Sequence, residues 1–274
     1  MADLAQPEGT PQVDEIFEGK KRKYFSQLAL RNLSAFRMHA KAGLWPDGDK
    51  WRTGRHELAV AARCEAIGEL LRLSPDACKR LTYSGTVHDF YKTREMQISA
   101  EARGAGKSQW EAFAEAEDKA KEKLTEARVD PLIIEIADAA GHNGVNDMDA
   151  ILKERDLSDQ QIARLALHYI DSISNQDQWS APAEIRDVTR QKINALDRRM
   201  DGLESADRYR ALNEEGRQHF NGATAYQAMR RTGHAIEERF AELIMERTGT
   251  PIDPLELPTI IDARIREKIM EIPE

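Results

Sequence analysis

The chain has 274 residues, of which 41% are hydrophobic and 32% are charged, so it can bury a sizeable core and is not disordered throughout. Its net charge of −8 argues against non-specific nucleic-acid binding as its main role, although a local basic pocket remains compatible with it. The two cysteines, Cys64 and Cys78, lack CxxC spacing, which excludes a disulfide framework and a cysteine-rich zinc site. We therefore expect a cytoplasmic protein.

The amino-terminal segment, residues 1–14, is polar and has no apolar run like that of a signal peptide, so we expect a flexible tail there. No run of about 18 apolar residues occurs, which predicts that no helix spans a membrane and that a membrane is not a partner. Because no repeat and no clear linker divides the rest, we expect residues 15–274 to form a single domain.

Helical periodicity dominates the chain, whereas the strict alternation typical of strands is nearly absent. The pattern predicts one or two helices and a loop within residues 15–50, and two helices within residues 51–92. The second of these follows Ser74, which we expect to be its N-cap, with Pro75 in the first turn. The fold class is therefore predicted to be all-α, a helical bundle.

The rest of the chain continues this helical pattern. Residues 93–128 are rich in Ala, Glu and Lys and poor in large apolar side chains, so we expect a solvated helical excursion. Amphipathic helices return over residues 129–200: one is predicted over 133–144 and ends at a glycine, and another begins at a capping box of Ser158 and Gln161. Further helices and a short final one close the chain.

Two histidines and two aspartates occur in an informative order. His56 lies near the start of the helix predicted after residue 51, the pair His88-Asp89 lies at the end of the next helix, and Asp171 lies on a helix well downstream. Adjacent residues on a regular helix point about 100° apart, so His88 and Asp89 could reach one ion only near a helix end or a distortion.

This ordered set resembles the HD-domain superfamily of metal-dependent phosphohydrolases. Three segments carry the resemblance: Arg55–Ala61 is similar to the family's first-ligand helix, His88–Lys92 to its HDxxK variant, and Tyr169–Ile173 to its final-aspartate helix. The resemblance covers roughly residues 51–180. It implies that the helices outside this range are accessory to an HD-like core.

The resemblance implies that one divalent metal per chain is bound by His56, His88, Asp89 and Asp171. Imidazoles combined with carboxylates suit Mn, Fe, Co, Ni or Zn better than Ca. A metal there would lower the pKa of its bound water and neutralise charge that develops on phosphorus. The expected function is hydrolysis of a small phosphorylated substrate, with nucleotides among the candidates.

Four residues are candidates for contact with that substrate. Lys92 matches the lysine that often follows the HD pair by three residues and would offer a point charge to phosphate; the alternative is a lysine at a helix C-terminus, favoured by the dipole. Arg55, next to a ligand, is the second phosphate candidate; the alternative is a plain surface role. By analogy with nucleotide-cleaving members of the family, Arg37 and Trp45 are weak further candidates.

Two more histidines could serve a second metal or the substrate, as the resemblance implies. His142 lies at the end of the predicted helix 133–144, where Asp138 could orient its imidazole; the alternative is a helix-end histidine stabilised by the dipole. His168 lies three residues before Asp171 and shares its helix face, so a packed neighbour is the alternative. Between Asp89 and Asp171, only His142 is well placed to be an extra ligand, so we expect a mononuclear site.

Two other functions stay open. A di-iron oxygenase of the same superfamily would need about two more histidine ligands, which His142 and His168 would have to supply. A non-catalytic ligand-binding or scaffold protein could retain the fold, but buried His and Asp side chains are costly to keep without partners. The acidic composition favours a small substrate over a long nucleic acid. The accessory helices could also cap the site or form a homo-oligomer.

Overall fold

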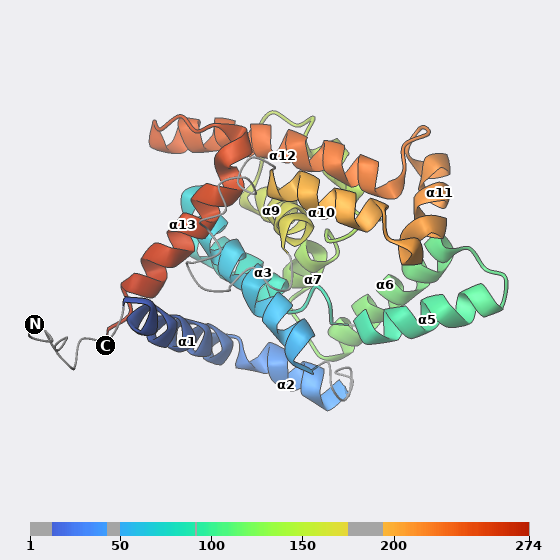
Figure 1. Cartoon of the computed structure of the whole chain (residues 1–274), viewed down its shortest axis with the longest axis horizontal. Helices are drawn as coiled ribbons and strands as arrows, with labels where there is room; N and C mark the ends of the chain where they lie inside the picture. Colours follow the sequence, from blue (N-terminus) through green and yellow to red (C-terminus); the bar gives the residue numbers. More distant parts are fainter. Residues whose placement is uncertain (1–12, 43–49, 91, 175–193, 274) are drawn as a thin grey trace, which may run out of the picture.

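The computed structural model describes residues 13–42, 50–90, 92–174 and 194–273. These residues form helices and connecting turns without a strand, which confirms the predicted all-α class (Figure 1). The helices in chain order are α1 (Val13–Arg31), α2 (Leu33–Ala42), α3 (Lys50–Leu70), α4 (Pro75–Gly85), α5 (Lys92–Gly104), α6 (Gln109–Glu126), α7 (Pro131–Ala137), α8 (Val145–Ile151), α9 (Asp159–Ile173), α10 (Ala195–Glu204), the short η3 (Asp207–Tyr209), α11 (Arg210–His219), α12 (Ala225–Thr248), the short η4 (Pro254–Glu256) and α13 (Leu257–Met270).

The predicted tail of residues 1–14 lies outside the described residues except for Val13 and Asp14, which begin α1. The predicted loop within 15–50 separates α2 from α3, and most of it also lies outside the described residues. Within the described part of the chain, none of the helices is long and apolar enough to cross a membrane.

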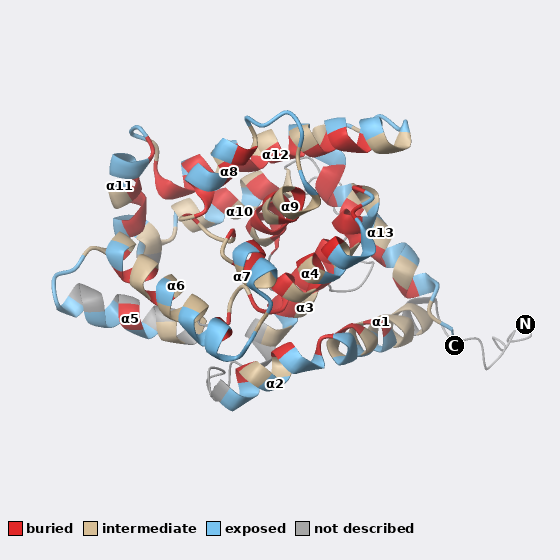
Figure 2. Ribbon diagram, turned by 180° about the vertical axis from the view of Figure 1, so that it is seen from behind, coloured by how far each residue is buried: buried red, intermediate tan, exposed pale blue. Residues whose placement is uncertain are grey.

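Helix α3 runs through the middle of the structure and contacts α4, α9 and α13 (Figure 1). Helix α9 is buried on almost every side, as its colour in Figure 2 shows, and α4 packs against both α3 and α9. A continuous core of buried apolar side chains extends from Tyr24 of α1 to Ile269 of α13. The predicted metal ligands belong to α3, to the turn after α4 and to α9, so this core sets their relative positions.

Local signals place the starts of α4 and α9. Ser158 and Gln161 form the predicted capping box, in which each side chain bonds to the other residue's backbone N–H. Ser74 is the N-cap residue of α4, as predicted, but its hydroxyl makes no capping hydrogen bond. Its backbone N–H donates instead to Asp159 Oδ2 of α9, 3.0 Å away. This bond ties the starts of α4 and α9 together.

The helices outside residues 51–180 brace α3. Tyr24 of α1 donates its hydroxyl hydrogen to Glu65 of α3, with an O–O distance of 3.0 Å. Arg63 of α3, only 1% exposed, donates to Asp262 of α13 and to Ser174 at the end of α9, each at 3.0 Å. Because a buried guanidinium is stable only with such partners, Arg63 fixes α3 against both neighbours.

The segment 93–128 is less solvated than predicted. It folds into α5 and α6, and α6 buries small side chains together with Phe113 and Leu124. The carboxylate of Glu215 in α11 accepts hydrogen bonds from the backbone N–H groups of Gln109 and Trp110, at 3.0 and 2.6 Å. Alanine-rich helix faces can pack closely without many large apolar side chains. The shortage of such side chains in this segment therefore did not mean that it is exposed to solvent.

The predicted helix 133–144 is wrong at its end, because α7 stops at Ala137. The chain then turns through Gly141, whose φ is +80°, a conformation that favours glycine. A Cβ on Gly144 would lie only 2.5 Å from the carbonyl oxygen of Ala139, so this close turn requires glycine. His142 therefore lies in the loop between α7 and α8, and not at a helix end.

Candidate metal centre

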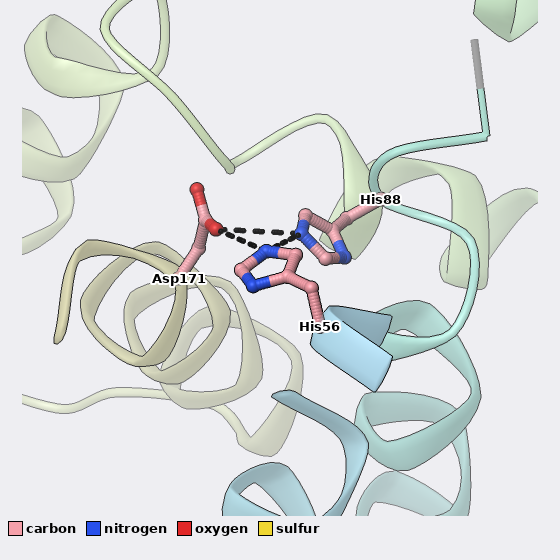
Figure 3. Close-up of side chains that lie close together, drawn as sticks. All are labelled: His56, His88 and Asp171. Atoms are coloured by element: carbon pink, nitrogen blue, oxygen red, sulfur yellow. Dashed lines mark hydrogen bonds and ion pairs between the residues drawn. The ribbon is translucent and has the colours of Figure 1, made fainter. Parts of the chain in front are cut away.

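Three of the four predicted ligands converge on one point (Figure 3). His56 Nε2 lies 3.2 Å from His88 Nε2 and 3.2 Å from Asp171 Oδ1, and His88 Nε2 lies 3.3 Å from the same oxygen. The three side chains come from α3, from the turn after α4, and from α9. Among the described residues, they are the group of His, Cys, Asp and Glu side chains that is compact enough to hold a metal ion.

The donor set fits a divalent transition metal. Metal–nitrogen and metal–oxygen bonds of about 2.0 Å in a tetrahedral site place neighbouring donor atoms about 3.3 Å apart. The three observed separations, 3.2, 3.2 and 3.3 Å, agree with that spacing. Two imidazole nitrogens and a carboxylate oxygen are ligands that Mn, Fe, Co, Ni and Zn accept.

The HD pair, His88-Asp89, lies in a turn and not on a regular helix. Its two adjacent side chains can therefore face the same ion. Helix α4 ends at Gly85, and residues 86–90 continue as turns in place of the helix end predicted from sequence. His88 Nδ1 lies 3.0 Å from the carbonyl oxygen of Gly85. Since a carbonyl only accepts, Nδ1 carries a hydrogen, and in the neutral ring Nε2 keeps its lone pair for the centre.

Asp89 borders the same cluster at longer range. Its Oδ2 lies 3.6 Å from His56 Nε2 and 3.7 Å from His88 Nε2. Its other oxygen, Oδ1, lies 3.6 Å from Lys92 Nζ. Asp89 therefore contacts both imidazole ligands, while the compact group itself contains only His56, His88 and Asp171.

Charge is balanced within the cluster. Burial alone would raise the pKa of Asp171, but hydrogen bonds from His56 and His88 hold it well below its usual value. Burial alone would lower the pKa of His88, yet the carboxylates of Asp89 and Asp171 raise it to about 9. In the absence of a metal, the His88 imidazole is therefore protonated at neutral pH, and its positive charge is balanced by the carboxylates of Asp89 and Asp171.

Metal affinity should therefore rise with pH. The metal binds only the unprotonated His88, and a pKa of about 9 in the metal-free centre means that one proton must leave below that pH. Displacement of one proton predicts about a tenfold gain in affinity per pH unit between pH 6 and 8. Calorimetric titration with Mn²⁺ or Co²⁺ at pH 6, 7 and 8 measures this slope, and a dissociation constant that stays the same across this range would contradict it.

The second-metal candidates are not members of the compact group. His142 is buried, and its ring packs edge-on against Trp110, with centroids 4.7 Å apart. Burial lowers the pKa of His142 to about 3, so the ring is neutral. Asp138 does not orient it, because its carboxylate pairs with Lys121 of α6 at 2.8 Å. His168 is fully buried, and its Nδ1 bonds to the carbonyl oxygen of Ala139 at 2.8 Å.

The predicted substrate residues have different surroundings. Lys92 is the first residue of α5, so the alternative of a lysine at a helix C-terminus is wrong. Its side chain is 43% exposed, and its ammonium lies beside Asp89 at the edge of the centre. Arg55 of α3 and Arg37 of α2 are exposed, and Trp45 lies outside the described residues.

Two buried polar residues near the turn of residues 86–90 were not predicted from the sequence. His39 of α2 is fully buried, and its Nε2 lies 3.2 Å from Oε1 of Glu57, which is also fully buried. Burial lowers the pKa of His39 to about 4 and raises that of Glu57 well above its ordinary value, so both environments favour the uncharged forms. Glu57 follows His56 directly, which was the one available signal; nothing in the sequence linked His39 to it.

Comparison with known proteins adds no relative: no protein-family model, curated protein or solved structure matches this chain. The fold and the site together therefore define the class: an all-α protein with a His–His–Asp cluster that could hold a metal ion.

Proposed function

We propose that this protein is a metal-dependent phosphohydrolase of the HD-domain type that acts on a small phosphorylated substrate, with nucleotides among the candidates. The observation that carries the proposal is the compact group of His56, His88 and Asp171, whose donor atoms lie 3.2–3.3 Å apart. The order and surroundings of these residues in the sequence resemble that superfamily, and the compact group supports a metal site at the same positions.

The chain's own residues would divide the work. His56, His88 and Asp171 would hold the metal, and Asp89 would complete the set from beside the two imidazoles. A bound divalent metal would supply an activated water and neutralise charge on a phosphate oxygen. The Gly85 carbonyl orients the His88 ring. Lys92, half-exposed at the edge, would attract the phosphate of the substrate.

A mononuclear centre is the form that we propose. His142 and His168, which a di-iron oxygenase would need as ligands, lie outside the compact group. His142 packs among aromatic rings, and His168 bonds to a backbone carbonyl. We therefore propose a hydrolase with about one metal per chain, in the cytoplasm.

Released phosphate tests this proposal. Purified protein, stripped of metal and reloaded in turn with Mn, Fe, Co, Ni or Zn, is incubated with a panel of phosphorylated metabolites that includes nucleoside monophosphates. We expect phosphate release that requires the metal. A protein that binds about one metal per chain but releases phosphate from none of these compounds would contradict the hydrolase function and favour a non-catalytic ligand-binding role. Oxygen consumption by a two-metal form would favour the oxygenase.

A further inference from the structure

The side chains of the HD pair depend on a turn and not on a regular helix. After α4 ends at Gly85, the N–H of His88 bonds back to the carbonyl of Ser84 at 2.9 Å, and the N–H of Phe90 bonds to that of Val87 at 3.0 Å. In a helix, each side chain direction follows from the repeating backbone. In this turn, the directions of His88 and Asp89 depend on whatever holds the carbonyls and rings of residues 86–90 in place.

His39 of α2 contacts this turn on both sides of the pair. Its Nε2 lies 2.9 Å from the carbonyl oxygen of Thr86, two residues before His88. Its ring meets the ring of Phe90, directly after Asp89, edge-on, with centroids 5.0 Å apart. Its side chain is 1% exposed, so water does not compete for these contacts. One buried side chain from α2 thus holds the residues that flank the HD pair.

The chemistry of the contact identifies the hydrogen-bond donor. A backbone carbonyl only accepts, so the 2.9 Å approach requires that His39 Nε2 carries the hydrogen. Burial lowers the pKa of His39 to about 4, so the ring is neutral and brings no positive charge towards a metal. A neutral N–H donor of this kind can hold a carbonyl beside a cation site without repelling the cation.

We infer that His39 is a positioning residue of the metal centre: through the Thr86 carbonyl and the Phe90 ring, it fixes the turn that presents His88 and Asp89. The role of His39 rests on the proposed metal centre and not on phosphate hydrolysis. Helix α2, which lies outside the segment that resembles the HD superfamily, would then help to hold the metal centre in place. Groups that hydrogen-bond directly to a metal ligand typically contribute about 10- to 100-fold to metal affinity. His39 acts through the turn and not on a ligand, so we expect a contribution at the lower end of that range, about tenfold.

A matched pair of variants tests this role. Gln and Met have nearly the same length and shape, but only Gln can donate a hydrogen to the Thr86 carbonyl. Titration of the metal-free protein with Co²⁺ should show an affinity about tenfold weaker in His39→Met, the lower end of the range for groups that orient ligands directly. The affinity of His39→Gln should stay within about threefold of the wild type, because its amide replaces the lost donor. His219→Met, at an exposed histidine that stacks on Trp110, is the control and should bind Co²⁺ like the wild type.

Hydrogen exchange of the metal-free proteins provides a readout that does not depend on metal. The amides of His88 and Phe90 should exchange about fivefold faster in His39→Met, and at the wild-type rate in His39→Gln. Equal Co²⁺ affinity and equal exchange in the wild type, His39→Met and His39→Gln would overturn the role of His39. Equal losses in His39→Met and His39→Gln would also overturn it, because lost packing and not a lost donor would then explain them. If His39→Met does not fold, as loss of its helical circular dichroism would show, His39→Gln alone decides the matter. Faster exchange than wild type at residues 86–90 in His39→Gln then overturns the positioning role of His39. A wild type that binds no Co²⁺ refutes the metal centre itself, and the role of His39 with it.

Discussion

Replacement of Asp171 by alanine should remove the metal and the activity together. Asp171 Oδ1 is the single oxygen that lies 3.2 Å from His56 Nε2 and 3.3 Å from His88 Nε2, so the variant loses the one carboxylate in the compact group. Loss of a partner behind a ligand costs about 10- to 100-fold in affinity, and loss of the ligand itself should exceed that range. Elemental analysis after dialysis, together with a Co²⁺ titration, measures the effect.

The matched control is Asp138→Ala. Asp138 also pairs with a cation, Lys121 at 2.8 Å, but it lies away from the compact group. This control should keep about one metal per chain. The double variant His88→Ala, Asp89→Ala extends the test to the HD pair and should bind no metal. If Asp171→Ala or the double variant holds as much metal as Asp138→Ala, these residues are not the ligands.

Lys92→Ala should show the opposite combination, with the metal retained and turnover reduced. The ammonium of Lys92 lies 3.6 Å from Asp89 Oδ1, where its positive charge opposes a bound cation, so its removal takes away no ligand. Its side chain is 43% exposed at the edge of the centre, where a phosphate can reach it. A charge-assisted contact to phosphate is worth about 1.5–3 kcal/mol, so the rate constant should fall about tenfold to a hundredfold.

Two further variants make the Lys92 result decisive. Lys92→Arg keeps the positive charge and should retain more activity than Lys92→Ala, while metal content stays equal in both. Arg55→Ala removes the other candidate, which is exposed on α3. Full activity in Lys92→Ala on the best substrate would contradict the phosphate contact, and a loss in Arg55→Ala would then assign that contact to Arg55.

The parts of the fold that were correctly predicted depend on neighbours along the chain. Apolar spacing predicted the helices around His56 and Asp171, and the capping box of Ser158 and Gln161 is present as expected. Such signals act within a few residues, so they can be read from one sequence. The end of α7 was placed too far along the chain, because apolar spacing does not reveal that the backbone turns at Gly141, with a φ of +80°, before the glycine at 144. Asp138 meets a partner from another helix, Lys121.

The sequence by itself determined the all-α class and the order of the candidate ligands along the chain. Only the tertiary structure decided which of them meet: His56 and Asp171, 115 residues apart, lie 3.2 Å from each other, whereas His142 and His168 lie outside the compact group. It also brought in His39 from α2, which no local pattern connected to the site. The physical reason is that a ligand set depends on how α3, α4 and α9 pack and on where a turn directs its side chains. Those contacts are made between residues far apart in the chain, and the periodicity of each helix does not encode them.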